Sequence, residues 1–138
     1  MSAADRFPKS SPDEGGYESE SAPWPNELRL LKEQARLEVE FSDGRTYSLP
    51  AEYLRVESPS AEVQGHGPGQ KTIVPGRRRV NITTIEPVGN YAIRLVFDDG
   101  HETGIYSWSY LRELGDEQAE RWSAYELALQ QRGLSRDR

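Results

Sequence analysis

The sequence contains no cysteine and no long apolar run. The first absence excludes a disulfide scaffold, a cysteine-ligated zinc or iron–sulfur site, and a thiol nucleophile. The longest aliphatic or aromatic runs have three residues, as at Leu95-Val96-Phe97, so we expect no segment that spans a membrane. The first residues also lack the apolar stretch of a secretory signal. Together these absences predict a soluble, cytoplasmic protein.

Charge divides the 138 residues unevenly, with 17 basic and 23 acidic side chains and a net charge of −6. Residues 1–22 hold five of the acids, two bases and few large apolar groups, which predicts a disordered acidic tail. We expect a single domain over residues 23–132 and a flexible C-terminus over residues 133–138. Because the domain is nearly neutral, its charge argues against a nucleic-acid partner.

Two stretches alternate apolar and polar residues with the period of a half-buried strand. The first runs from Leu37 through an Asp-Gly turn to Leu49, and the second runs from Tyr91 through another Asp-Gly turn to Ile105. Aligned, the two stretches match at Phe41, Asp43 and Gly44 against Phe97, Asp99 and Gly100. Each predicts a hairpin followed by a short helix. The likeness has two explanations, a duplication or the convergence of common turns.

A final helix is predicted from Asp116, as its N-cap, to Gly133. Trp122, Tyr125 and Leu129 share one face of it, which favours the core; a docking face for a partner is the alternative. The predicted fold is therefore α+β: a small antiparallel β-sheet built from two similar hairpin–helix units, with the C-terminal helix packed on it.

The loop over residues 56–80 is rich in glycine and proline and carries polar tips. Its Gly65–Thr72 stretch misses the phosphate-binding P-loop pattern, because Gln70 stands where that pattern needs glycine. Arg77–Arg79 could contact phosphates, but a short basic run without interleaved aromatic residues is typical of a solvated surface. An RNA-associated module is thus the weakest of the functional readings.

His66 and His101 are the two histidines of the chain. Carboxylates flank His101 in the second Asp-Gly turn, and a histidine with carboxylates can bind a divalent metal. Neither histidine belongs to a recognisable motif for a serine or cysteine nucleophile. The sequence therefore predicts no catalytic residue and no enzyme activity.

Several long motifs, in order, resemble the gamma-butyrobetaine hydroxylase-like N-terminal domain family. They are WPNELRL, the strand–SDG–strand segment, LPAEYLRVESPSAEVQGHGPGQ and IEPVGNYAIRLVFDDGHETGIYSWSYLRELG. The chain is similar to the stand-alone bacterial form; such domains are also joined to Mrp-type iron–sulfur carrier ATPases and to 2-oxoglutarate/iron hydroxylases. The hydroxylase site lies in a separate β-helix domain, for which this chain has no room, so oxygenase activity is not implied.

In the hydroxylases that this chain resembles, the domain carries a zinc ion held by three cysteines and one histidine. The cysteine positions correspond to Ser58, Ser60 and Val63, and the histidine to His101. Since serine is a poor zinc ligand and valine is none, we expect that this zinc–cysteine site is lost. Iron or zinc is then a possibility by family resemblance alone, and no cofactor is predicted.

We favour a non-catalytic binding or accessory module whose partner is another protein, by family analogy one that handles iron–sulfur clusters or metals. The alternative is a metal-binding protein that holds Fe²⁺ or Zn²⁺ through His66, His101 and nearby carboxylates. The sequence does not predict the oligomeric state. The predicted partner-binding residues come from the loop and the second turn: Ser58, Ser60, Glu62, Gly65, His66, Gly67, Gly69, Gln70, Asp99 and His101.

Overall fold

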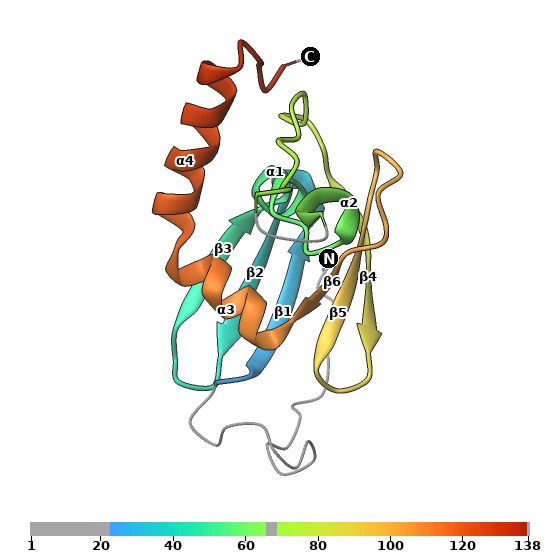
Figure 1. Cartoon of the computed structure of the whole chain (residues 1–138). Helices are drawn as coiled ribbons and strands as arrows, with labels where there is room; N and C mark the ends of the chain where they lie inside the picture. Colours follow the sequence, from blue (N-terminus) through green and yellow to red (C-terminus); the bar gives the residue numbers. More distant parts are fainter. Residues whose placement is uncertain (1–22, 66–68, 138) are drawn as a thin grey trace.

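The computed structural model describes residues 23–65 and 69–137, so the predicted tail lies outside the described residues. The first half of the chain forms a three-stranded antiparallel sheet in the order β1-β2-β3 (Figure 1). Its strands are β1 (Pro25–Leu31), β2 (Arg36–Phe41) and β3 (Thr46–Pro50). The predicted alternation is confirmed, because Leu37, Val39, Phe41 and Leu49 are all buried.

The second half forms another three-stranded antiparallel sheet in the order β4-β5-β6. It comprises β4 (Ile82–Val88), β5 (Ala92–Phe97) and β6 (Ile105–Ser107). Strand β4 was not predicted, because a register shift between Ile82 and Thr84 breaks its alternation. Ile82 and Ile85 are consequently both buried, three positions apart.

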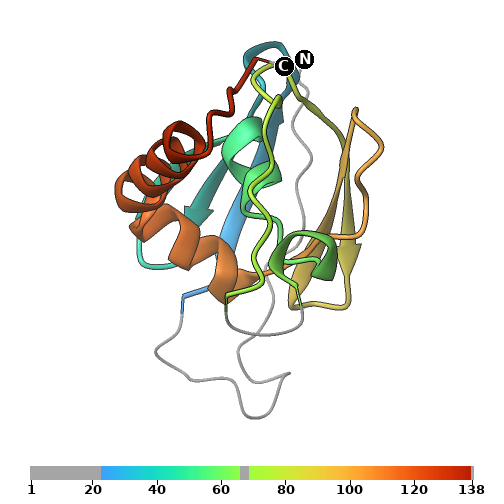
Figure 2. The ribbon, with the colours of Figure 1, turned by 45° about the horizontal axis from the view of Figure 1, so that its top comes forward.

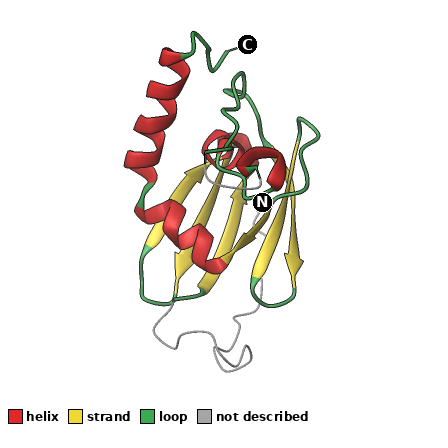
Figure 3. Cartoon of the chain, viewed as in Figure 1, coloured by secondary structure: helices red, strands yellow, loops and turns green. Residues whose placement is uncertain are grey.

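Each sheet leads into helical structure, as the two hairpin–helix units predict (Figure 3). Helix α1 (Ala51–Val56) follows β3, and the one-turn α2 (Ala61–Gln64) follows shortly after. Helix α3 (Trp108–Asp116) follows β6, with the Ser107 side chain accepting a hydrogen bond from the Tyr110 N–H at its start.

The terminal helix α4 covers Gln118–Gln131, with Glu117 as its N-cap. The prediction of Asp116 as N-cap is wrong: Asp116 is the last residue of α3, and its carboxylate accepts hydrogen bonds from Tyr47 and Arg112 instead. Because the Asp116 carboxylate binds these two side chains, it does not cap the first turn of α4. No helix within the described residues is long and apolar enough to cross a membrane.

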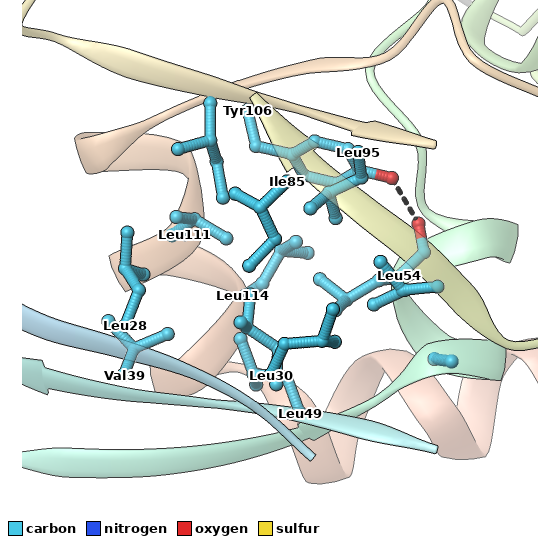
Figure 4. Packing of buried hydrophobic residues seen from close by; sticks show 14 of the residues in the cluster. Leu28, Leu30, Val39, Leu49, Leu54, Ile85, Leu95, Tyr106, Leu111 and Leu114 are labelled. Atoms are coloured by element: carbon cyan, nitrogen blue, oxygen red, sulfur yellow. Dashed lines mark hydrogen bonds between the residues drawn. The ribbon is translucent and has the colours of Figure 1, made fainter. Parts of the chain in front are cut away.

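The main core lies between the two sheets and is closed by α1 and α3 (Figure 4). Side chains of the first sheet, such as Leu30 and Leu49, point toward Ile85 and Leu95 of the second. The hydroxyl of Tyr106, itself fully buried, donates to the Leu54 carbonyl of α1 at 2.5 Å. One continuous apolar interior therefore joins both hairpin–helix units, and the α+β prediction is confirmed with its strands divided between two sheets.

A second, smaller cluster places α4 on the rest of the molecule (Figure 2). Tyr125 and Leu129 are 5% exposed and pack with three valines, and the Tyr125 hydroxyl donates to the Val74 carbonyl at 2.6 Å. The predicted apolar face of the helix is therefore core. Its valine partners come from α1, α2 and the segment that precedes β4: Val56, Val63 and Val74.

The residues after α4 fold back along the segment that precedes β4. The Gly76 N–H donates to the Ser135 carbonyl at 2.9 Å, and the Arg78 N–H donates to the Arg136 carbonyl at 3.1 Å. Arg136 also forms two hydrogen bonds, of 2.9 and 2.7 Å, with the carboxylate of Glu52 in α1. The C-terminal segment thus lies beside residues 76–78 (Figure 2).

Candidate functional site

The predicted loop and the second Asp-Gly turn meet where α1 ends. Ser58 is fully buried, two residues past α1, and His101 is 6% exposed in the turn between β5 and β6. The Ser58 Oγ lies 2.9 Å from the His101 Nε2. A contact between residues 43 positions apart therefore joins the two hairpin–helix units.

Glu62 completes a chain of three polar side chains. Its Oε1 lies 3.1 Å from the His101 Nδ1, and its side chain is 65% exposed. Helix α2 presents Glu62 here because Ser60 caps that helix, accepting a hydrogen bond from the Glu62 N–H. A neutral His101 fits both contacts when Nδ1 donates to Glu62 and Nε2 accepts from the Ser58 hydroxyl.

The electrostatics favour that neutral imidazole. Burial lowers the pKa of His101, and the nearby positive charge of Arg55 lowers it further. Glu62 and Asp99 oppose this effect, but the net direction is downward. His101 therefore works as a hydrogen-bonding core residue at neutral pH.

The order Ser58–His101–Glu62 has the residue types of a hydrolase triad, but its setting differs. A nucleophile must reach a substrate carbon, and the Ser58 side chain has no exposed surface. A Cβ atom added at Gly104 would lie 2.5 Å from the Ser58 Oγ, so the β6 side of the hydroxyl is also closely packed. The arrangement can fix two segments to each other, and it leaves no room for a substrate at Ser58.

Asp99 organises the turn itself. Its Oδ1 accepts from the His101 N–H at 3.0 Å, and its Oδ2 accepts from the Arg55 Nε at 2.8 Å. Although burial raises the pKa of Asp99, these hydrogen bonds and the charges of Arg55 and Arg77 bring it below its ordinary value. The turn is therefore tied to α1 through a charged group as well as through Ser58.

The glycine-rich part of the loop is pinched at its base. Gly65 has a φ of +76°, and a Cβ atom there would lie 2.5 Å from the Gln70 Cβ. The Thr72 N–H donates to the Val63 carbonyl at 2.6 Å, which closes the loop beneath them. Gly69 lies in open space, whereas His66 and Gly67 lie outside the described residues. A site shared by His66 and His101 therefore stays a prediction.

The residues at the zinc positions that the resemblance implies do not fit zinc. The Ser58 hydroxyl is bonded to His101, and Ser60 caps α2. Val63 has no donor atom, and its side chain lies in the smaller apolar cluster. Across residues 23–65 and 69–137, no group of three or more histidine, aspartate or glutamate side chains could hold a metal ion.

Sequence reasoning missed three residues that shape this site. Arg55 anchors Asp99, Gly104 leaves space for the Ser58 hydroxyl, and the Tyr106 ring lies beside Gly104. Arg55 lies on a short helix whose residues are all buried. The helix therefore has no polar face in its sequence pattern from which the position of Arg55 could be predicted. Gly104 interrupts the start of a predicted strand, and a glycine inside a strand pattern can indicate that another part of the chain packs closely against the backbone there.

Comparisons with known proteins agree with the fold. One solution NMR structure is similar with 42% identity and a TM-score of 0.73, and the match covers 83% of this chain and 90% of the other. A second solution NMR structure has 44% identity and a TM-score of 0.74, and that match covers 86% of this chain and 88% of the other. A crystal structure of a protein with unknown function of the DUF971 family from Acidithiobacillus ferrooxidans has 42% identity and a TM-score of 0.57. That match covers 67% of this chain and 92% of the other. The comparison with curated proteins gave no match.

The family model described as gamma-butyrobetaine hydroxylase-like, N-terminal, matches residues 28–112. This range begins in β1 and ends in α3, and it contains both sheets and the Ser58–His101 contact. It confirms the resemblance read from the motifs. The chain therefore belongs to the gamma-butyrobetaine hydroxylase-like N-terminal family.

Proposed function

We propose that this chain is a non-catalytic binding module that recognises another protein. The recognition surface is the face around the Ser58–His101 contact, here called the latch face: residues 58–65, 69–70 and 99–101. The observation that carries the proposal is that contact, since it holds a loop of one unit against a turn of the other. A face held in one conformation loses little entropy when a partner binds.

The exposed groups of the latch face suit protein recognition. Glu62 projects a carboxylate into solvent, and Gly69 and Gln70 are exposed at the loop base. The pinch between Gly65 and Gln70 fixes where the loop leaves the surface. Polar groups on a fixed scaffold provide specificity, while the buried Ser58 and His101 act as support.

Two observations support a module that is not catalytic. The matched family corresponds to the N-terminal part of hydroxylases, and Ser58 cannot meet a substrate. By the same family analogy, the partner is a protein that handles iron–sulfur clusters or metals. The proposed compartment is the cytoplasm, on the ground of a sequence without cysteine or a long apolar run.

The test is affinity capture of the full chain from its own cells after brief crosslinking. We expect a specific partner with the wild type, and its loss with the double variant Glu62→Lys, Gln70→Ala. Both residues are on the surface, but Glu62 also accepts a hydrogen bond from the buried His101, so urea unfolding of the double variant is measured to confirm that it remains folded. The matched control is Glu120→Lys, which makes the same charge reversal at an exposed position of α4.

The proposal is wrong if the double variant captures the same partner in the same amount as the wild type. Metal analysis of the captured, tag-free protein addresses the alternative through His66 and His101. A stoichiometric metal that is lost in the His66→Ala variant would replace the protein-binding proposal with that alternative.

A further inference from the structure

A second polar region borders the Ser58–His101 contact through Asp99, where three segments converge. They are the segment before β4, the turn after β5, and the C-terminal segment. Between them is a pocket of about 700 Å³. Its charged lining consists of Arg77, Arg78, Arg79, Asp98, Asp99, Arg136 and Asp137.

The cations of this pocket are all arginines. Four guanidinium groups line it against three carboxylates, so the lining carries one excess positive charge in a chain of net charge −6. Guanidinium groups present planar pairs of N–H donors that match the oxygens of phosphate and carboxylate groups. The lining is therefore suited to an oxyanion.

Two guanidinium groups share one carboxylate oxygen at the inner wall. The Asp99 Oδ2 lies 2.8 Å from the Arg55 Nε and 2.7 Å from the Arg77 Nε. Among the described residues, the buried Arg55 Nη1 has no hydrogen-bond partner, and neither has the Arg77 Nε, whose N–H is not aligned with Asp99. Arg55 lies behind the pocket lining, and both of these nitrogens are buried, so they hold Asp99 in place rather than face a ligand. The groups that a ligand would meet are the partly exposed side chains of Arg77 and Arg78 and the exposed Arg79.

The outer wall already contains a bound carboxylate. Asp137 accepts two hydrogen bonds from Arg78, of 2.5 and 3.1 Å, and its side chain is 61% exposed. Arg79 is exposed, and within the described ranges it forms no hydrogen bond or close ion pair, although its charge helps to lower the pKa of Asp137. A solute anion would therefore find one unpaired guanidinium group and compete with Asp137 for another.

We infer that this pocket is a binding site for an oxyanion, a phosphate or carboxylate group of a small ligand, with Arg77, Arg78 and Arg79 as its donors. Asp137 acts as an internal competitor that lowers the affinity for that ligand. The inference does not rest on the proposed protein-binding function, although the pocket shares Asp99 with the latch face.

The test is a titration of the isotope-labelled full chain with inorganic phosphate at neutral pH, followed by amide NMR shifts, with sodium chloride matching the ionic strength. We expect saturable shifts at residues 77–79 and 98–100. Arg79→Gln should weaken binding about threefold or more, the size of a partly exposed charge contact. Asp137→Asn should strengthen it by a similar factor, because Arg78 loses its internal partner.

Arg29→Gln is the matched control, since Arg29 is half exposed on β1 in the other sheet. It should leave phosphate binding unchanged. A parallel titration with acetate separates a site for phosphate oxygens from one that accepts any carboxylate. The inference is overturned if phosphate shifts no more than chloride does, if Arg29→Gln weakens binding as much as Arg79→Gln, or if Asp137→Asn weakens it.

Discussion

At the scale of single residues, the space for the Ser58 hydroxyl depends on Gly104, which lies in the segment between β5 and β6. A Cβ atom at Gly104 would lie 2.5 Å from the Ser58 Oγ and 3.1 Å from the Tyr106 ring. Both neighbours are fully buried, so neither can move into solvent. The contact between the two units consequently requires the smallest residue at position 104.

Gly104→Ala should lower the free energy of unfolding by about 1–3 kcal/mol, the usual cost of overpacking a core. Urea unfolding of the purified variant measures it. In a Ser58→Ala background the same substitution should cost less, because the closest atom is gone. Equal costs in the two backgrounds would contradict the packing argument.

We predict that the stability of the protein depends on pH through His101. Burial lowers the pKa of His101 from 6.5, so the unfolded chain binds a proton more readily than the folded one. The stabilisation is fully present above pH 6.5 and declines as the pH falls through that value toward the folded pKa. The groups facing the ring are Arg55, Glu62 and Asp99.

We therefore expect the free energy of unfolding to decrease on acidification below pH 6.5, and to decrease less in His101→Gln. Urea unfolding at a series of pH values measures both slopes. Asp99 acts in a separate window: its lowered pKa gives stability that is lost below the ordinary aspartate value of 3.8. Identical slopes for the wild type and His101→Gln between pH 5 and 6.5 would exclude the histidine as the cause.

At the scale of elements, α4 illustrates how one helix combines a core face and a solvent face. Leu129 is 5% exposed within the smaller apolar cluster, whereas Leu127, two positions away, is 53% exposed. Successive positions of a helix point in different directions, so two leucines this close in sequence have opposite roles. They form a matched pair for measuring how firmly α4 is packed.

Leu129→Ala should cost about 2–4 kcal/mol of stability, from lost apolar burial and the cavity left behind. Leu127→Ala should change it by less than about 0.5 kcal/mol. Thermal unfolding of both variants under identical conditions provides the comparison. Equal effects would mean that α4 does not pack through Leu129.

Much of this fold follows from sequence patterns, and the exceptions have physical causes. Alternation from Leu37 to Phe41 predicts β2, because a half-buried strand needs that period. The bulge in β4 destroys the same signal at Ile82 and Ile85. The Ser58–His101 contact lies beyond any local pattern, since tertiary packing brings the two residues together across 43 positions.

At the scale of the whole molecule, the C-terminal segment connects elements that are distant in sequence. Arg136 pairs with Glu52, which is 84 positions away and 7% exposed, and its guanidinium lies 5.1 Å from the centre of the Trp122 ring. One side chain thereby links the chain end to α1 and α4. Removing it would leave a nearly buried carboxylate without the cation that neutralises it.

Arg136→Ala should lower the free energy of unfolding by about 1–3 kcal/mol, because the Glu52 carboxylate loses its charged partner. Faster hydrogen exchange at the Gly76 and Arg78 amides should accompany it, since these amides bond to the same segment. Arg132→Ala, an exposed position just after α4, is the control and should change neither. Unchanged exchange at Gly76 and Arg78 would show that this segment is held in place by other contacts.

The sequential strand order has a consequence for how the chain folds. In both sheets every hydrogen-bonded strand pair is formed by consecutive strands, β1-β2-β3 and β4-β5-β6. Each hairpin therefore closes a short loop at little entropic cost, and either sheet can assemble before the other. We expect the contacts between the two sheets, among them the one between Ser58 and His101, to form later than the hairpins, because they close longer stretches of chain.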